Sequence, residues 1–527
     1  MWRGREGRRP TTSSARAAAW DGLPGRSNRL FDALAALACA LALVTAFQTV
    51  DGLRWPHAAD HFRDLAQAQS ALDGHPLADP SYAGEWLWYN PLVPWLTALG
   101  IFLGRLTGVA VMPETFHVQA GPWVNLLGPV AFYALVRRVS GGGAALCALI
   151  IFLFFNSRYD SALHQASYSP WLFAATFAQG LFFLAVRLAL WVRERETAGR
   201  AAVLGAAAGL LLLANTTPAL VLGAVAVRLF SARTVSIAGG VAIAMASPLL
   251  YSIVVHYRFQ VLNAVPMTSE PWLPASFARV PELLVPNLVI FALAAGGWFL
   301  VGERAVRAWL WSAALLMAYG LTRDLLPSLP PVVATFHFWR YTMAAVTVFA
   351  GAACWWLCVR AAGTRAPLLL AAASVAAVAL AYPGYVDRPD SWGRAIALRR
   401  SPDAPLVGEY LRRTTPPDTV VLSVNEASQN VVAAAGRRVV ALDPMLSNPY
   451  VDVARRAIAQ ERMFAALGGG DSARFLELAR EYRVTRVVLL DAAACRAADR
   501  APLVIVQRFS RACVLAIRAS AQADPEQ

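Results

Sequence analysis

The chain has 527 residues, of which 57% are hydrophobic and only 15% are charged, and its formal net charge is +14. A soluble globular protein has about 45–50% apolar and roughly 25% charged residues, so this composition excludes an ordinary soluble enzyme. The positive charge does not indicate nucleic-acid binding, because no basic tract is interleaved with aromatic residues in the pattern such binding uses. We expect no nucleic-acid partner.

The hydrophobic residues gather in blocks long enough to cross a bilayer. The first block, 31–50, has no basic residue, and its length matches a hydrocarbon core of ~30 Å at 1.5 Å per helical residue. Similar blocks recur until about Tyr382. We therefore predict a polytopic α-helical membrane protein with eleven crossings, at 30–50, 118–137, 142–156, 170–190, 201–214, 217–230, 234–255, 283–301, 307–321, 338–359 and 366–382.

Arginine placement orients these crossings. The arginines concentrate before the first block and in alternate short loops, at 137–138, 193–200, 228–233, 304–307 and 360–365. Cytoplasmic loops carry such an excess. We expect a disordered basic cytoplasmic N-terminus at 1–29, a membrane domain at 30–383 in the inner (plasma) membrane, and a soluble extracytoplasmic tail at 384–527.

Two apolar stretches have an ambiguous relation to the membrane. Pro91, Pro94 and several glycines interrupt the stretch 91–111. Counting it as a crossing would reverse every later helix, so we interpret it as an interfacial or re-entrant helix on the outer face. The short blocks on either side of Asn215–Pro218 indicate either one broken helix or a tight hairpin.

The tail changes character. Its short β-branched runs predict strands, and the stretches between them have helical periodicity, which together indicate a small α/β domain with a partly parallel sheet. Cys495 and Cys513 are able to pair if the tail is extracytoplasmic. The expected strands are 419–424, 438–442, 485–490, 503–507 and 513–517, and the expected helices are 405–414, 426–435, 452–467 and 472–482.

The first outer loop, 51–117, carries the densest polar cluster: Asp60, His61, Arg63 and Asp64. Apolar residues from Phe62 onwards have helical spacing, so the cluster opens a short helix with Asp60 at its start and Asp64 one turn on along the same face. Such a pair suits a divalent cation, or a general base acting on a hydroxyl group. Capping of an ordinary helix with a solvated face is the structural alternative.

This loop resembles the first periplasmic loop of GT-C superfamily glycosyltransferases, which use polyprenyl-phosphate-linked sugars. The protein mannosyltransferase and aminoarabinose transferase branch is the most similar. The resemblance is carried by Asp60-His61, the helix through Leu72, Gly74-His75-Pro76, Trp86-Leu87-Trp88-Tyr89 and Pro91-Leu92.

The resemblance implies a membrane enzyme that moves a sugar from a polyprenyl-phosphate donor to a lipid, glycan or protein acceptor, with inversion at the anomeric carbon. The family's catalytic Asp corresponds to Asp60. Its second acidic position holds His61, so either Asp64 substitutes for it or His61 acts as a base near neutral pH. A divalent cation, Mg²⁺ or Mn²⁺, is a possible cofactor, with Asp60, Asp64 and Asp160 as ligands.

Further candidate residues lie in other outer segments. Asp160 and His164 follow the third crossing, and Glu270 and Trp272 lie in a later loop. His337 and Arg340 begin a helix, where Arg340 is suited to a lipid phosphate or, alternatively, belongs to an interfacial aromatic belt. We assign substrate binding to Arg63, Trp88, Tyr89, Asp160, His164, His337 and Arg340.

Three other functions remain open from the sequence. A transporter or flippase normally has ionisable residues in mid-span and internal repeats, whereas here the ionisable residues gather on outer loops. An O-antigen polymerase or ligase relies on Arg and His in a large late loop rather than on acids in the first loop. An inactive GT-C-like scaffold is the third alternative, because His61 replaces the second acid.

Overall fold

The computed structural model describes residues 25–56, 58–109, 111–155, 167–268, 281, 284–326, 328–329, 336–386, 393–398, 402–498 and 502–518. Most of the predicted disordered segment 1–29 lies outside these residues, as do Asp160, His164, Glu270 and Trp272.

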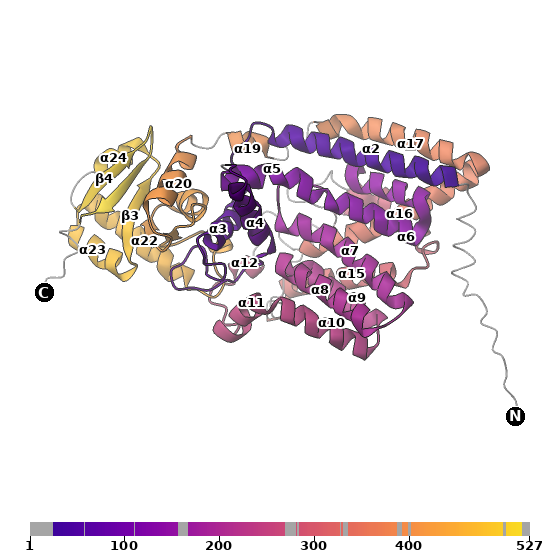
Figure 1. The fold of residues 1–527 in the computed structure, drawn as a ribbon, viewed down its shortest axis with the longest axis horizontal. Coiled ribbons are helices and arrows are strands. Elements are labelled where there is room, and N and C mark those ends of the chain that lie inside the picture. Colours follow the sequence, from indigo (N-terminus) through magenta and orange to yellow (C-terminus); the bar gives the residue numbers. More distant parts are fainter. Residues whose placement is uncertain are drawn as a thin grey trace, which may run out of the picture.

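Helices form an elongated bundle with a small sheet at one end (Figure 1). Helix α16 (Phe336–Ala362) packs on α6 (Leu127–Ile150), α14 (Leu288–Trp298), α15 (Arg304–Leu325) and α17 (Ala366–Val386). The other bundle elements are α2 (Gly25–Val50), η1 (Ile151–Phe155), α7 (Ala174–Glu194), α8 (Ala198–Ala214), α9 (Thr216–Leu229), α10 (Ala232–Met245), α11 (Ser247–Leu250), η3 (Tyr251–His256), η5 (Val285–Asn287) and η6 (Gly363–Arg365). The short helix α12 (Val265–Thr268) lies against the tail at Pro444–Leu446.

By length and composition, four helical stretches of the described chain are able to cross a membrane: Asn28–Val50, Pro113–Phe155, Ala174–Glu194 and His337–Ala381. The second and fourth are 43 and 45 residues long, about twice what one crossing needs. Each contains two of the predicted crossings, and α6 is interrupted at Gly141 between its pair. A fifth candidate is the pair Ala232–Met245 and Ser247–His256, bent by 73°.

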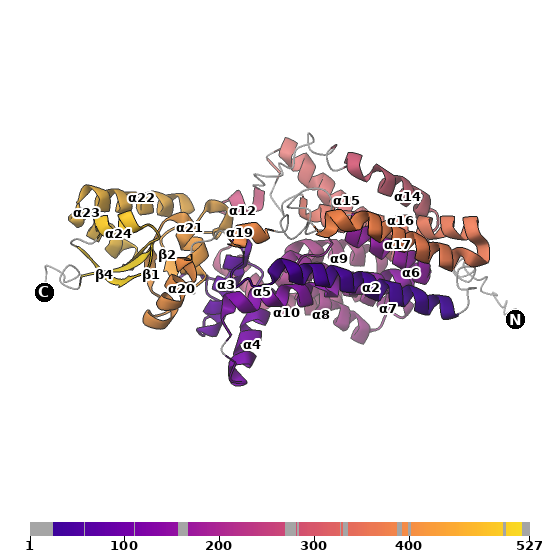
Figure 2. The same cartoon turned by 90° about the horizontal axis from the view of Figure 1, so that it is seen from above.

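The structure resolves the form of both ambiguous stretches. Asn215 separates α8 from α9 and caps the second helix, because its Oδ1 accepts the N–H of Thr217 at 3.0 Å; the two helices pack side by side as a hairpin. Helix α4 (Leu92–Leu106) is viewed end-on in Figure 1 and projects away from the long axis in Figure 2. An orientation across the bundle is what an interfacial helix requires.

The tail contains a five-stranded sheet in the order β2-β1-β3-β5-β4. Strands β1 (Val420–Leu422), β2 (Arg438–Val439) and β3 (Val484–Leu489) are parallel, whereas β4 (Leu503–Arg508) and β5 (Cys513–Ile517) are antiparallel to their neighbours. All five predicted strands and the partly parallel sheet are confirmed. The tail helices are α19 (Arg394–Leu398), α20 (Asp403–Thr414), α21 (Asn425–Ala427), η7 (Ser428–Ala433), η8 (Pro444–Leu446), α22 (Val453–Gly469), α23 (Ser472–Glu481) and α24 (Ala492–Ala498).

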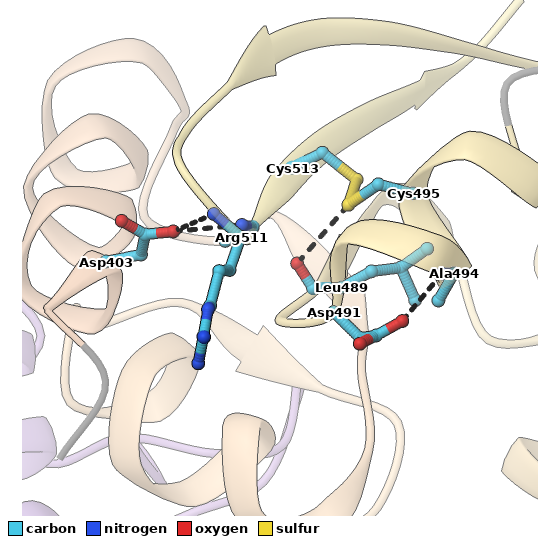
Figure 3. The surroundings of a disulfide bond; sticks show 8 residues. Asp403, Leu489, Asp491, Ala494, Cys495, Arg511 and Cys513 are labelled. Atoms are coloured by element: carbon cyan, nitrogen blue, oxygen red, sulfur yellow. Dashed lines mark hydrogen bonds between the residues drawn. A yellow bond between two sulfur atoms is a disulfide. The ribbon is translucent and has the colours of Figure 1, made fainter. Parts of the chain in front are cut away.

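The cysteine pair of the tail is bonded. Cys495 on α24 and Cys513 on β5 form a disulfide with their Cα atoms 5.9 Å apart (Figure 3). Arg511 and Ala512, in the turn just before Cys513, donate their backbone N–H groups to the carboxylate of Asp403 at the start of α20. Together these bonds tie both α20 and α24 to the β4–β5 hairpin.

The two faces of the sheet are covered differently. Helices α22 and α23 cover one face through residues such as Met463 and Phe475. The other face packs against α20, η7 and α3 (Ala59–Leu72), which comes from the first outer loop. Between the sheet and the bundle lie α3, α4 and α5 (Pro113–Asn125) (Figure 1). The first outer loop therefore lies between the two parts of the molecule.

Candidate active site

Helix α3 begins with a cap made by a histidine. His61 donates its backbone N–H to the carbonyl of Ala58, and the N–H of Ala58 is donated to His61 Nδ1, both at 3.2 Å. This reciprocal pair satisfies two donors at the helix start, as Ser or Thr with Glu does in many helices. Asp60 lies in the first turn, as predicted, but it is not the cap.

Arg63 holds the two acids of α3 together. Its Nη2 lies 2.8 Å from Asp60 Oδ1, and its Nε lies 4.0 Å from Asp64 Oδ1. The guanidinium also lies flat on Tyr89, with Cζ 3.5 Å from the ring centroid, a cation–π contact. The side chain of Asp60 is 49% exposed while that of Asp64 is 2% exposed. Asp60 is therefore the carboxylate that a substrate is able to reach.

Burial governs the electrostatics of this cluster. It raises the pKa of the Asp64 carboxyl from 3.8 to about 7, with Arg63 acting against the shift and Asp60 adding to it. Burial works against the charge of Arg63, but its acidic neighbours outweigh that effect and the pKa of the guanidinium is raised. In the described part of the chain, Asp64 Oδ1 accepts no hydrogen bond. The expectation of a solvated helix face is wrong for Asp64.

His61 is enclosed rather than presented to solvent. It is fully buried, and its ring centroid lies 4.2 Å from that of Phe173, 5.5 Å from His117 and 5.7 Å from Trp171. Since its Nδ1 already accepts a hydrogen bond from the backbone, the ring is placed to stabilise the start of α3. The role of His61 as a base stays a prediction, beside those of Asp60 and Asp64.

Arg340 lies in the first turns of α16 and is 9% exposed. Within the described residues, the side-chain hydrogen bond that it donates goes to Thr176 Oγ1 on α7, at 3.4 Å. One weak bond leaves most of its five donor hydrogens available. A buried cation with free donors suits a bound anion, and a planar guanidinium matches the oxygens of a phosphate.

His337 connects Arg340 to the acidic cluster. It lies on the same helix, and its imidazole interacts electrostatically with Asp60, Arg63 and Arg340. Residues of α3 and of α16 therefore lie near enough for their charges to interact, although more than 270 positions of chain separate them in the sequence.

The other predicted site residues have different outcomes. Trp88 packs edge-on against Tyr89, with ring centroids 5.5 Å apart, which places it beside the cluster. Asp160 and His164 lie outside the described residues. The sequence analysis missed Thr176 and His117. A polar side chain within a predicted crossing is a usable signal for Thr176; His117 lies at the edge of one, at the end of the predicted first outer loop.

A divalent cation between Asp60 and Asp64 does not fit the described residues, because Arg63 already supplies the positive charge that both carboxylates face. The described part of the chain also contains no group of three His, Cys, Asp or Glu side chains suited to a metal ion. The ligand role predicted for Asp160 falls outside that part.

No protein-family model matches this chain, and no curated protein matches it. Solved structures match its fold. The ArnT protein of Cupriavidus metallidurans, bound to undecaprenyl phosphate, superposes with a TM-score of 0.53 at 15% identity, over 93% of this chain and 99% of that chain. The apo state of the same protein gives 0.52 at 16% identity, over the same shares of the two chains.

The arabinofuranosyltransferase AftD from mycobacteria superposes with a TM-score of 0.50 at 14% identity, over 92% of this chain and 40% of that longer chain. Both ArnT and AftD are GT-C superfamily glycosyltransferases. The fold expected from the first outer loop is therefore confirmed over nearly the whole chain.

Proposed function

We propose that this chain is a membrane glycosyltransferase that moves a sugar from a polyprenyl-phosphate donor to a hydroxyl group of a lipid, glycan or protein acceptor. The observation that carries the proposal is the pairing of a half-exposed carboxylate, Asp60, with a buried Arg340 that has donors to spare, within one site. The undecaprenyl phosphate bound to ArnT supports the choice of donor, because the two chains share one fold.

In the proposed reaction, Asp60 acts as general base. Its carboxylate accepts the proton of the acceptor hydroxyl, and the hydroxyl oxygen forms a bond to the anomeric carbon of the sugar. The bond between that carbon and the phosphate oxygen breaks, and its electron pair leaves with the polyprenyl phosphate. Attack from the face opposite the leaving group inverts the anomeric configuration.

The remaining residues of the site have supporting roles in this proposal. Arg340 receives the phosphate and stabilises the charge that it gains as it leaves. Arg63 orients the carboxylate of Asp60 through their 2.8 Å contact. Trp88 lies next to Tyr89 at the rim of the cluster and offers a flat face to a sugar ring. No step requires a metal ion.

The reaction is proposed to take place on the extracytoplasmic side of the inner membrane. Eleven crossings with a cytoplasmic N-terminus would place both the first outer loop and the tail, 384–527, outside. The Cys495–Cys513 disulfide supports this orientation, because structural disulfides persist in oxidising compartments. The cysteine of an Arg413→Cys variant, at an exposed tail position, is expected to react with a membrane-impermeant maleimide in intact cells; labelling only after the membrane is permeabilised would contradict the orientation.

Activity is tested in proteoliposomes with a panel of radiolabelled undecaprenyl-phosphate sugars and an extract of envelope lipids and glycans as acceptors. The readout is a new alkali-stable glycosidic product, which a flippase would not form. Asp60→Asn is expected to lower the rate by about 10²–10⁴-fold. The control is Asp51→Asn, an exposed acid of the same loop. Normal turnover of Asp60→Asn would exclude Asp60 as the base.

A further inference from the structure

Helix α3 is part of the hydrophobic core of the tail. Phe62 and Leu65 on α3 are fully buried and pack in one cluster with Leu411 of α20 and Val431 of η7. A buried side chain of this size contributes about 1.5–3 kcal/mol to holding its helix in place. The helix that carries Asp60 is therefore held by the tail on one side, in addition to the rings that enclose His61.

Polar contacts hold both ends of α3 to the tail. At its start, Gln429 of η7 donates from Nε2 to the carbonyl oxygen of Ala59 at 3.3 Å, one residue before Asp60. At its end, the buried Arg437 donates to Asp73 Oδ2 at 3.3 Å. These two contacts restrict movement of α3 along its axis, and the apolar packing restricts movement perpendicular to that axis.

A buried ion pair joins the tail to the membrane bundle. Arg412 of α20 makes a bidentate contact with Glu114 of α5, and their side chains are 11% and 2% exposed. The far end of α5 is fixed to the bundle, since Asn125 donates to the carbonyl oxygens of Ser169 and Trp171 at 2.9 and 2.6 Å. Removing one partner of such a pair leaves a buried charge without its counterpart.

The proposed site therefore draws on both parts of the molecule: α3, which carries Asp60, packs against the tail, and Arg340 belongs to the bundle. We propose that Gln429 and the Glu114–Arg412 pair are positioning residues, which set the distance between Asp60 and the sugar whose phosphate is held at Arg340. This inference rests on the proposed function. A misplacement of about 1 Å at a reacting atom costs about 10²-fold in rate.

The test compares four variants in the proteoliposome assay: Arg412→Glu, Glu114→Arg, their combination, and Gln429→Leu. Each single change is expected to lower kcat by about 10-fold or more while the donor KM stays within about 3-fold, because Arg340 is untouched. The combined reversal restores the ion pair and is expected to recover most of kcat. Arg413→Glu, on the exposed side of α20, is the matched control.

The outcomes separate this inference from the proposed function. Wild-type kcat in both Arg412→Glu and Gln429→Leu overturns the inference and leaves the function intact. If Arg412→Glu fails to fold, judged by aggregation on size-exclusion chromatography in detergent, Gln429→Leu alone decides in the same way. If the wild-type chain forms no product, the proposed function fails. The positioning role then fails with it, whereas wild-type kcat in the variants of an active enzyme overturns the positioning role alone.

Discussion

Asp60 and Asp64 lie one turn apart on α3 and face the same arginine, but the side chain of Asp60 is 49% exposed and that of Asp64 is 2% exposed. Arg63 lies within 4.0 Å of Asp64 and is itself largely buried, 11% exposed, against the ring of Tyr89. Two acids of one motif therefore have different environments. Asp60 is open to a substrate, whereas the buried Asp64 acts on its neighbours through its electrostatic effect.

Asp64 makes the stability of the protein depend on pH. Its pKa is raised from 3.8 to about 7 on folding, so the unfolded chain releases this proton first and stability falls as pH rises from about 4 to about 7. Asp64→Asn removes the buried charge. We expect its gain in Tm over wild type to be larger at pH 8 than at pH 5, measured by differential scanning fluorimetry in detergent. An equal gain at both values, or a larger gain at pH 5, would contradict the assignment; Asp51→Asn is the control.

Arg340 is expected to bind the donor phosphate. Its replacement by Ala removes charge-assisted hydrogen bonds worth about 1.5–3 kcal/mol, and so is expected to raise the donor KM by about 10–100-fold. Lys keeps the charge but loses the planar fork, so Arg340→Lys is expected to lie between Ala and wild type. Arg360→Ala, at the other end of α16, should leave KM unchanged. A donor KM that is insensitive to Arg340→Ala would remove this residue from the site.

The tail is expected to depend on its disulfide. Cys495 and Cys513 are 18 positions apart, and closing a loop of this length stabilises a folded domain by about 3 kcal/mol in the chain-entropy view. The Cys495→Ser/Cys513→Ser variant is expected to unfold at lower denaturant concentration than wild type. Reductant should lower the wild-type midpoint to that of the variant and leave the variant unchanged. A variant that is still sensitive to reductant would show that another thiol is responsible.

Two glycines have a left-handed backbone conformation, but only one of them is closely packed. Replacing each by Ala therefore distinguishes the cost of backbone strain from the cost of a steric clash. Gly436 has φ +75° and a Cβ there would lie 2.4 Å from Gln69 Cγ on α3, whereas Gly470 has φ +76° and open space around it. Gly470→Ala is expected to cost about 1 kcal/mol from strain alone. Gly436→Ala should cost more, measured by denaturant unfolding, and should also expose the first outer loop to protease. If both variants lose the same free energy of unfolding, the side chain of Gln69 on α3 shifts to accommodate the added methyl group without cost.

Local sequence patterns predicted the tail well. β-branched runs such as Val484–Leu489 alternate with amphipathic helices, and that information lies within a few residues of each element. The helix of the first outer loop was predicted from the spacing of Phe62 and Leu65 for the same reason. The number of crossings rests on span length and arginine placement, and eleven stays a prediction.

Contacts between distant segments were not predictable in this way. Glu114 and Arg412 are 298 positions apart, and no periodic pattern around either residue predicts that the two form an ion pair. The helix cap made by His61 was not predictable for a related reason: the imidazole is held by the rings of Phe173 and Trp171, which precede α7 and lie more than 100 positions later. The contact of Arg63 with Tyr89, which lies 26 positions later, was likewise not predictable.

The contact between Gln429 and Ala59 spans 370 positions of the chain. During synthesis at about 5–20 residues per second, α3 would emerge roughly 20–70 s before the tail segment that covers it. For that interval its apolar face has no tail to pack against, although the helices around it are already being inserted. Assembly of this site is therefore a late event of biogenesis, and a nascent chain stopped before η7 would carry every acid of the first loop without the surface that arranges them.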